Sequence, residues 1–388
     1  MRSNIQSSLA KRLRVGLFLA ALFLPFGGLV LNWNTTVSLE EKRDLAPLPE
    51  VPSGLAELAE LPRGMEKFIS DHFGFRQELS SLYNLIQLRV LAPKPSRWVV
   101  SGDDDWLYMG QSVSYARKNA PLSAKRLEAW ATLLRAKRDW LTRRGVRYVF
   151  TVAPSKPSIY SSQIPQDLAP APVSALDQLN GVLTGQSDIP WIDLKSMLLE
   201  QVATRQVYHK TDTHWNDTGA ALAASAVLRR AAMPGVTPPG LDDFRRRSVS
   251  GIGLDLAKML GLQYMLTEDY EVLSPLGSSP VAIRDRTYLG RDWGPYPARL
   301  FSTAGRSGRV AIVGDSFVMA TTFTDRIAEQ FATGVGVHRD KLSPDSPQDL
   351  ELLIKAVQPD LIVEELVERN LIRFAPDPKP FLEALAVQ

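Results

Sequence analysis

Hydrophobic and polar positions follow the periods of an α/β fold through most of the chain. A helical period begins at Ser123, which can cap the helix, and runs to about Arg144, where Gly145 ends it. Residues 146–152 form a short apolar run typical of a buried strand. Further strands are expected at 189–194, 309–313 and 360–365, and further helices at 216–232, 317–331 and 350–357. This alternation predicts a mostly parallel sheet between two layers of helices.

The remaining segments are less regular. Residues 39–62 are rich in proline and glutamate and predict an irregular linker, whereas residues 64–91 have a helical pattern. Residues 241–303 contain glycines and aromatics and are compatible with an inserted hairpin. The run Gly102-Asp103-Asp104-Asp105 predicts a solvated turn. A calcium loop is the alternative, but no spaced set of ligands follows.

Residues 15–31 form an uncharged apolar stretch that is interrupted by Pro25 and the Gly27-Gly28 pair. As a helix it would span about 25 Å, near the lower limit for crossing a bilayer. Lys11, Arg12 and Arg14 lie just before it, and the next charge is Glu40. The positive-inside rule therefore predicts a signal anchor at 15–31 with a cytoplasmic tail at 1–14. The alternatives are a cleaved signal peptide and a buried soluble helix.

Composition narrows the chemistry. The 388 residues contain no cysteine, which excludes disulfides, thiolate metal sites and cysteine nucleophiles. The net charge of +3 comes from the first 31 residues, because the rest of the chain has 41 basic and 42 acidic residues. No basic face is evident, so nucleic acid is not an expected partner.

A strand, a tight turn and a helix are expected around Gly314-Asp315-Ser316-Phe317. A serine in this position is held by the strand end, and the helix N-terminus directs N–H groups at a developing oxyanion. Such residues also make ordinary turns and caps. Asp315 is expected to bond to the local backbone rather than to take part in chemistry.

The run Asp212-Thr213-His214-Trp215 supplies an acid and an imidazole two positions apart. In an extended or loop backbone, side chains at i and i+2 face the same way. Asp212 can then hold Nδ1 of His214 and leave Nε2 for Ser316, which predicts a Ser-His-Asp triad. A surface loop is one alternative. Metal ligation by His209, Asp212 and His214 is another, and it is not favoured; neither a metal nor a cofactor is predicted.

These motifs resemble the SGNH-hydrolase-like polysaccharide O-acetyltransferases of the AlgJ/AlgX group, in which the Asp-x-His motif precedes the serine. Five shorter fragments are also similar: Glu41-Lys42-Arg43-Asp44-Leu45-Ala46-Pro47, Asp71-His72-Phe73-Gly74-Phe75-Arg76, Asp105-Trp106-Leu107-Tyr108, Pro154-Ser155-Lys156 with Ile159-Tyr160, and Gly253-Leu254-Asp255-Leu256. Glu368-Arg369-Asn370 is a sixth. The resemblance covers roughly residues 38–375 and implies an SGNH-like three-layer sandwich.

The resemblance implies that Ser316 takes an acetyl group and passes it to a hydroxyl of a secreted polysaccharide, alginate or another exopolysaccharide, with His214 as base and acid. It also implies a membrane-bound O-acyltransferase as acetyl donor and a periplasmic catalytic domain anchored in the inner membrane. The expected organisation is a tail at 1–14, an anchor at 15–31, a linker with a helical lead-in at 32–98, and the acetyltransferase domain at 99–388. We expect no appended carbohydrate-binding module after residue 375. An acetylesterase of the same fold and a non-catalytic export component are the alternatives.

Four residues are candidates for substrate binding, each with a structural alternative. Lys156 would bind a carboxylate of the polymer, unless it is a surface lysine. Trp215 would stack on a sugar, unless it is buried behind the loop. Arg369 would contact substrate, unless it pairs with Glu365 or Glu368. Tyr296, like Trp293, would line a glycan cleft, unless it packs the irregular region.

Overall fold

The computed structural model describes residues 43–89, 98–118 and 121–387, and a few positions between 12 and 38. Its contacts divide the chain into two units, Met1–Lys94 with Ala257–Met265, and Pro95–Leu256 with Leu266–Gln388. The predicted tail and the predicted anchor at 15–31 lie mostly outside the described residues. In the part that the structure describes, we find no helix that is both long and apolar enough to cross a membrane.

The first unit contains a two-stranded antiparallel ladder, β1 (Val37–Ser38) with β2 (Arg43–Asp44), and two helices, α2 (Leu55–His72) and α3 (Arg76–Arg89). The predicted irregular linker is wrong from residue 55 onward, because α2 continues through Pro62 although a proline cannot donate to the preceding turn. The single helical pattern predicted for 64–91 is divided at 73–75, where Phe75 takes a left-handed φ of 59° that no helix accommodates.

The second unit is built on a seven-stranded sheet with the order β6-β5-β13-β11-β12-β10-β9. Its strands are β5 (Arg147–Ala153), β6 (Trp191–Ile192), β9 (Val281–Asp285), β10 (Ala298–Ser302), β11 (Arg309–Gly314), β12 (Thr333–His338) and β13 (Leu361–Val367). The first five strands in this order are parallel to one another. Strand β10 is antiparallel to both of its neighbours, β12 and β9. The sheet is therefore mixed, with the predicted parallel arrangement in its centre.

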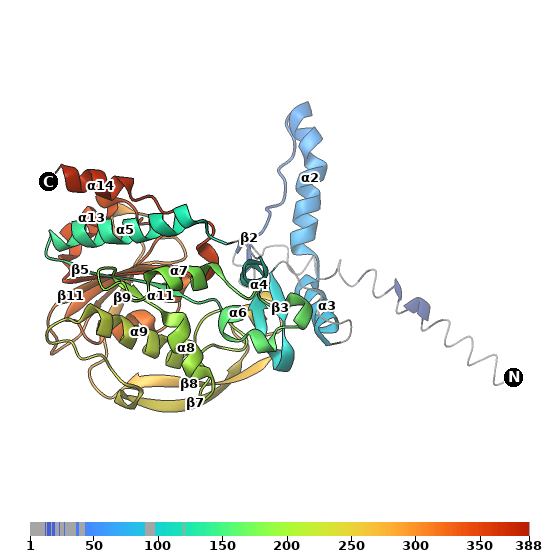
Figure 1. Cartoon of the computed structure of the whole chain (residues 1–388). Coiled ribbons are helices and arrows are strands. Elements are labelled where there is room, and N and C mark those ends of the chain that lie inside the picture. Colours follow the sequence, from blue (N-terminus) through green and yellow to red (C-terminus); the bar gives the residue numbers. More distant parts are fainter. Residues whose placement is uncertain are drawn as a thin grey trace. The chain divides into compact units, whose positions relative to one another are not determined.

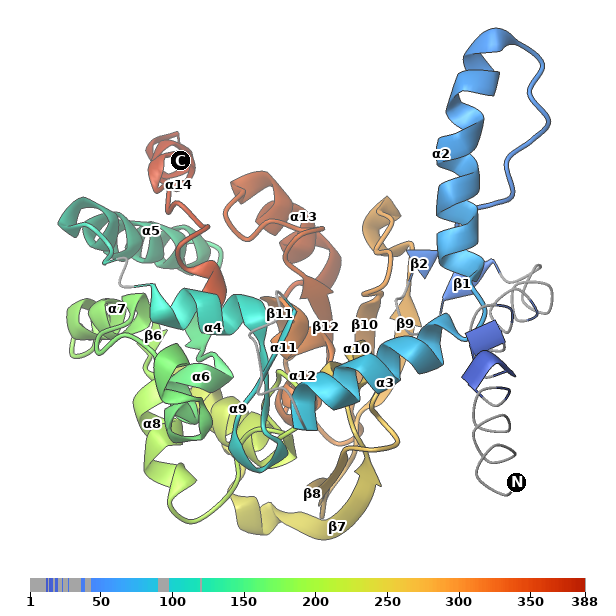
Figure 2. The same ribbon diagram turned by 90° about the vertical axis from the view of Figure 1, so that its right-hand side faces the viewer.

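Helices cover both faces of this sheet (Figures 1 and 2). Successive strand residues alternate between two cores, so Val149 and Ile312 face one side while Phe150 and Val313 face the other. The first core is closed by α8 (Leu194–Val202), α9 (Asp217–Ala231), α11 (Ser316–Met319) and α12 (Phe323–Ala328). The second is closed by α5 (Ala124–Thr142), α7 (Ala175–Leu183), α13 (Pro347–Val357) and α14 (Lys379–Ala386). This is a three-layer sandwich, as predicted.

Shorter elements complete the second unit. They are β3 (Val99–Ser101), η1 (Asp103–Asp105), β4 (Leu107–Met109), α4 (Gly110–Arg117), α6 (Lys156–Ile159), η2 (Ser161–Gln163), η3 (Gln166–Leu168), η4 (Leu241–Asp243), η5 (Tyr288–Gly290) and η6 (Glu368–Asn370). The inserted hairpin is present as β7 (Phe244–Ile252) paired with β8 (Thr267–Pro275), and α10 (Asp255–Met259) lies between these strands in sequence. The three aspartates form the predicted turn, as η1.

The structure around Ser316 differs from the prediction in two places. The helix predicted for 317–331 is divided into α11 and α12 by Thr321 and Thr322; the Thr321 hydroxyl accepts the Phe323 N–H. Strand β12 was not predicted, because its Gly334 and Gly336 are poor strand formers. A Cβ at residue 334 would lie 2.3 Å from the carbonyl oxygen of Val310, so the neighbouring strand requires glycine there.

Candidate active site

Three turns that follow parallel strands meet at one edge of the sheet. β5 leads into Pro154-Ser155-Lys156, β11 into Asp315-Ser316, and β13 into Glu368-Arg369-Asn370. Ala153 pairs with Val367 across one ladder, so the ends of β5 and β13 are level. In open α/β sheets this carboxyl edge is where ligands bind.

A hydrogen-bonded chain of the three predicted residues lies at this edge. His214 Nε2 is 3.0 Å from Ser316 Oγ, and His214 Nδ1 is 2.7 Å from Asp212 Oδ1. The Asp212 carboxylate also accepts the backbone N–H of His214, at 3.0 Å. A carboxylate beside Nδ1 favours the tautomer with the proton on Nδ1, which leaves Nε2 free to accept the serine proton.

The environment of Asp212 keeps its carboxylate charged. Burial would raise the pKa of Asp212, but the charge of His214 and its hydrogen bonds outweigh burial, and the pKa lies below its usual value. A permanently charged carboxylate at this position can stabilise an imidazolium that forms on His214. The geometry therefore suits removal of a proton from the Ser316 hydroxyl.

The turn around Ser316 is fixed by two buried carboxylates. Asp315 accepts the backbone N–H of Phe317 at 3.0 Å and that of Val367 at 2.7 Å, which confirms the backbone role expected for it. Glu365 accepts the N–H of Asp315 at 3.1 Å. A Cβ at Gly314 would lie 2.4 Å from Val318 Cγ2 and 2.6 Å from Glu365 Oε2, so a larger residue would have to displace these buried side chains.

One backbone donor is left beside the hydroxyl of Ser316. Among the described residues, no group accepts the N–H of Ser316, whereas the next N–H, that of Phe317, is held by Asp315. The first N–H groups of a helix have no partner within the helix. The Ser316 N–H is thus available to an oxyanion on an acyl group attached to its own side chain.

Trp215 and Lys156 are both buried and form hydrogen bonds within the protein. Trp215 is 1% exposed; its indole N–H donates to Thr321 Oγ1 at 3.0 Å and its ring packs edge-on against Phe317. Lys156 is 2% exposed, so the surface-lysine alternative is wrong. Its Nζ donates to the carbonyl oxygens of His209, Lys210 and Asp212, which uses all three N–H groups of the ammonium.

Arg369 and Tyr296 remain candidates for substrate contact. Among the described residues Arg369 forms no ion pair with Glu365 or Glu368, contrary to the pairing considered above, and its buried Nη1 has no hydrogen-bond partner. Burial lowers the pKa of Arg369, and the nearby Asp315 acts in the opposite direction. The guanidinium carbon lies 5.8 Å from the centre of the Phe317 ring. Tyr296 is 38% exposed and stacks on His338 with 4.7 Å between ring centres, whereas Trp293 is buried.

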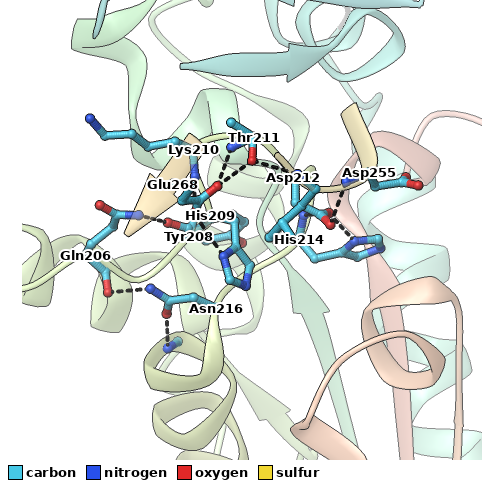
Figure 3. Close-up of polar contacts among 12 residues, drawn as sticks. Gln206, Tyr208, His209, Lys210, Thr211, Asp212, His214, Asn216, Asp255 and Glu268 are labelled. Carbon is cyan, nitrogen blue, oxygen red and sulfur yellow. Dashed lines mark hydrogen bonds and ion pairs between the residues drawn. The ribbon is translucent and has the colours of Figure 1, made fainter. Parts of the chain in front are cut away.

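Other side chains near the site were not anticipated from the sequence. Glu268, on β8, is buried and accepts from His209 Nδ1 at 2.9 Å (Figure 3). His209 and His214 therefore face different carboxylates, and the described residues contain no cluster of three metal-ligating side chains. Glu268 lies between Thr267 and Asp269, both exposed, so no pattern in the sequence marks it as buried.

Comparison with known proteins gives a consistent result. Residues 99–368 match the family described as the SGNH hydrolase-like domain of acetyltransferase AlgX. The chain is 31% identical over 126 residues to the probable alginate O-acetylase AlgJ of Pseudomonas aeruginosa, which covers 32% of this chain and 31% of that protein. It is 29% identical over 132 residues to the probable alginate O-acetylase AlgJ of Pseudomonas putida, which covers 33% of this chain and 32% of that protein.

These matches span about a third of the length of the curated relatives. Among solved structures, Bacillus cereus PatB1 with a sulfonyl adduct is similar with a TM-score of 0.51 and 15% identity, over 70% of this chain and 94% of that one. At this level of identity the likeness concerns the fold.

Proposed function

The chain belongs to the family of SGNH hydrolase-like acetyltransferase domains represented by AlgX, and from this premise we propose that it transfers acetyl groups through Ser316 to hydroxyls of a polysaccharide. The observation that carries the proposal is the hydrogen-bonded chain of Asp212, His214 and Ser316. The names of the relatives, probable alginate O-acetylases, support alginate or another exopolysaccharide as acceptor.

In the first half-reaction His214 Nε2 takes the proton of Ser316 as Oγ attacks the acetyl carbonyl carbon. The tetrahedral oxyanion lies within reach of the Ser316 N–H. The bond from carbon to the donor's oxygen then breaks, and His214 gives its proton to that oxygen. Acetyl-Ser316 and the deacetylated donor are the products.

In the second half-reaction a sugar hydroxyl attacks the acetyl carbon while His214 takes the hydroxyl proton. The bond to Ser316 Oγ breaks, and Oγ regains a proton from His214. Asp212 keeps its charge in both steps and stabilises the imidazolium. Water in place of the sugar would give an acetylesterase, which is why acceptor binding decides the reaction.

Arg369 and Tyr296 are the proposed contacts to the acceptor. Arg369 has a buried guanidinium nitrogen without a partner, and an unsatisfied charged donor is costly unless a ligand accepts from it. Tyr296 is close enough to Arg369 to affect its pKa, and its ring is partly exposed although one face stacks on His338. Aromatic rings commonly pack against sugars through their apolar faces.

The proposed location is the periplasm, with the chain held in the inner membrane by residues 15–31. The apolar stretch and the basic residues before it support this topology. An anchor would keep Ser316 near a membrane-bound O-acyltransferase, which we propose as the acetyl donor.

The test uses the full-length chain in detergent with a chromogenic acetyl ester as donor and an acetyl-free oligosaccharide as acceptor. We expect a mass increase of one acetyl group on Ser316 and acetylated oligosaccharide, both lost in Ser316→Ala and retained in the exposed-serine control Ser302→Ala. Free acetate without acetylated sugar would assign an esterase. An inactive wild-type chain would overturn the proposal in favour of a non-catalytic component.

A further inference from the structure

The loop that carries Asp212 and His214 has no regular secondary structure, yet its residues are buried or half-buried. It lies between Tyr208 and Trp215, which form an isolated antiparallel bridge, and it is followed by helix α9. Thr211 and Thr213 within it are buried. Buried backbone N–H and C=O groups outside helices and sheets need other partners. We call residues 209–214 the acid–base loop.

The carbonyl groups of the acid–base loop are held by one cation. Lys156 Nζ donates to the oxygens of His209 at 2.8 Å, Lys210 at 3.0 Å and Asp212 at 2.5 Å. The ammonium thus converges with three carbonyls from four consecutive residues. Burial lowers the pKa of Lys156 to about 7, and the charges of Asp212 and Glu268 act against that decrease.

The donors of the same loop are held by one anion. Glu268 accepts the backbone N–H of Lys210 at 2.8 Å and that of Thr211 at 2.8 Å (Figure 3). It also accepts the hydroxyl of Thr211 at 2.6 Å, in addition to His209 Nδ1. Hydrogen bonds to ionised groups are shorter and stronger than those between neutral groups.

A third set of contacts comes from the backbone around Asp255. Leu254 N–H donates to Thr211 Oγ1 at 2.9 Å, and Leu256 N–H to the Thr211 carbonyl at 3.0 Å. Asp255 N–H approaches Asp212 Oδ2 at 3.4 Å (Figure 3). The second carboxylate oxygen of Asp212 is thereby oriented while the first faces His214.

We propose that Lys156 and Glu268 are positioning residues for acetyl transfer: with opposite charges they fix the acid–base loop so that His214 Nε2 stays in hydrogen-bonding reach of Ser316. This inference rests on the proposed function. Neither side chain touches Ser316, so each acts through the loop. A cation that takes the carbonyls and an anion that takes the N–H groups together restrain the loop from both sides.

The physical reason for charged groups is the restraint they give. Burying a lysine and a glutamate is unfavourable unless each is fully paired, and their contacts with the loop provide that pairing. A displacement of about 1 Å at a catalytic base can lower a rate by roughly 100-fold. The loop therefore needs a more exact position than stability alone would require.

The test compares Glu268→Gln and Lys156→Met with two matched controls in the full-length chain. The controls remove the same charges at exposed positions, Glu271→Gln on β8 and Lys125→Met on α5. For a neutral acetyl ester we expect kcat to fall by about 10- to 100-fold in both loop variants, with KM within about threefold of wild type. Both controls should keep wild-type kinetics.

A spectroscopic readout separates positioning from stability. The chain has four histidines, so the Nδ1 proton of His214 can be assigned in ¹⁵N-histidine-labelled protein by its loss in His214→Ala. We expect this proton to be strongly deshielded in wild type and to shift or broaden in Glu268→Gln, while circular dichroism shows a folded chain. If Lys156→Met does not fold, Glu268→Gln still tests the positioning role, because glutamine has nearly the same size as glutamate.

The outcomes distinguish this proposal from the proposed function. A wild-type chain without acetyl transfer or ester turnover would overturn the function, and the His214 proton would still test the restraint. Active wild type with loop variants that keep both kcat and the His214 resonance would overturn the positioning role. Variants that lose only melting temperature would also overturn it, because Lys156 and Glu268 would then be purely structural.

Discussion

Replacing Asp212 by asparagine removes a charge while leaving the shape of the site intact. In the structure Asp212 Oδ1 accepts two donors from His214, and Oδ2 faces the N–H of Asp255 at 3.4 Å. An asparagine will keep its oxygen toward His214, because the opposite orientation would place its amide against two donors. The NH₂ group then faces the Asp255 N–H, so two donors oppose each other, but at 3.4 Å their repulsion is weaker. Both contacts to His214 are retained, and the negative charge is lost.

The size of the effect follows from that charge. In the proposed mechanism His214 takes the Ser316 proton, and an imidazolium then forms beside Asp212. With about 4 Å between the charge centres and an effective dielectric constant of about 20, the attraction is worth ~4 kcal/mol. Each ~1.4 kcal/mol changes a rate tenfold, so Asp212→Asn should lower kcat by about 10³-fold. Ground-state binding of a neutral ester should change little.

The assay is steady-state turnover of a chromogenic acetyl ester, with circular dichroism as a check on folding. The matched control is Asp193→Asn, the same change at the N-cap of α8, where asparagine caps as well as aspartate. The control should keep wild-type turnover. An Asp212→Asn enzyme that retains more than a third of wild-type kcat would show that the carboxylate charge does not support the imidazolium.

Three further results are expected. His214→Ala should lower turnover by about 10³-fold or more in a folded chain, measured with the same ester; residual activity within tenfold of wild type would exclude His214 as the base. Arg369→Met should raise KM for the oligosaccharide acceptor by about tenfold, because a charged hydrogen bond is lost, and leave acetylation of Ser316 by the ester unchanged; slower acetylation would place Arg369 in the first half-reaction instead. Burial raises the pKa of Glu365 in the folded chain well above its usual 4.5. Above pH 4.5 Glu365 therefore loses its proton in the unfolded chain while it is still protonated in the folded one. The wild-type free energy of unfolding then falls with rising pH, by up to ~1.4 kcal/mol per pH unit. The free energy of unfolding of Glu365→Gln, measured in urea, should therefore rise relative to that of wild type from pH 5 to pH 8. A difference between the two that does not change with pH would contradict the raised pKa of Glu365.

Local patterns predicted the parts of the molecule whose causes are local. Ser123 caps α5 as expected, because a side-chain oxygen at an N-cap satisfies a free N–H of its own helix, and Asn216 caps α9 in the same way. The Asp-x-His spacing predicted the contact between Asp212 and His214, because side chains two positions apart in an extended or loop backbone face the same way. The contact between His214 and Ser316 joins residues 102 positions apart, and it required the resemblance to a known family as well as the pattern.

The failures have causes that lie far away in the sequence. Lys156 follows a strand end, where a lysine is usually exposed, yet it is buried because carbonyls of a loop more than 50 residues later surround its ammonium. Arg369 has two glutamates nearby in sequence and pairs with neither. Glu365 points toward the Asp315 N–H and Glu368 toward the Ser155 N–H, each on another strand end. No local period encodes these choices.

The short fragments that carry the family resemblance have a common physical role in the second unit. Leu107, in the Asp105–Tyr108 fragment, donates its N–H to the Lys210 carbonyl at 2.9 Å. Lys156 and the Leu254–Leu256 backbone hold the same loop from other directions. Glu368 holds the Ser155 N–H at 2.7 Å and so fixes the residue before Lys156. Four separated fragments therefore restrain one loop, in addition to the three residues of the proposed chemistry. A relative that kept Asp212, His214 and Ser316 but lost these restraints should fold and yet transfer acetyl groups slowly, because the imidazole would no longer stay beside the serine.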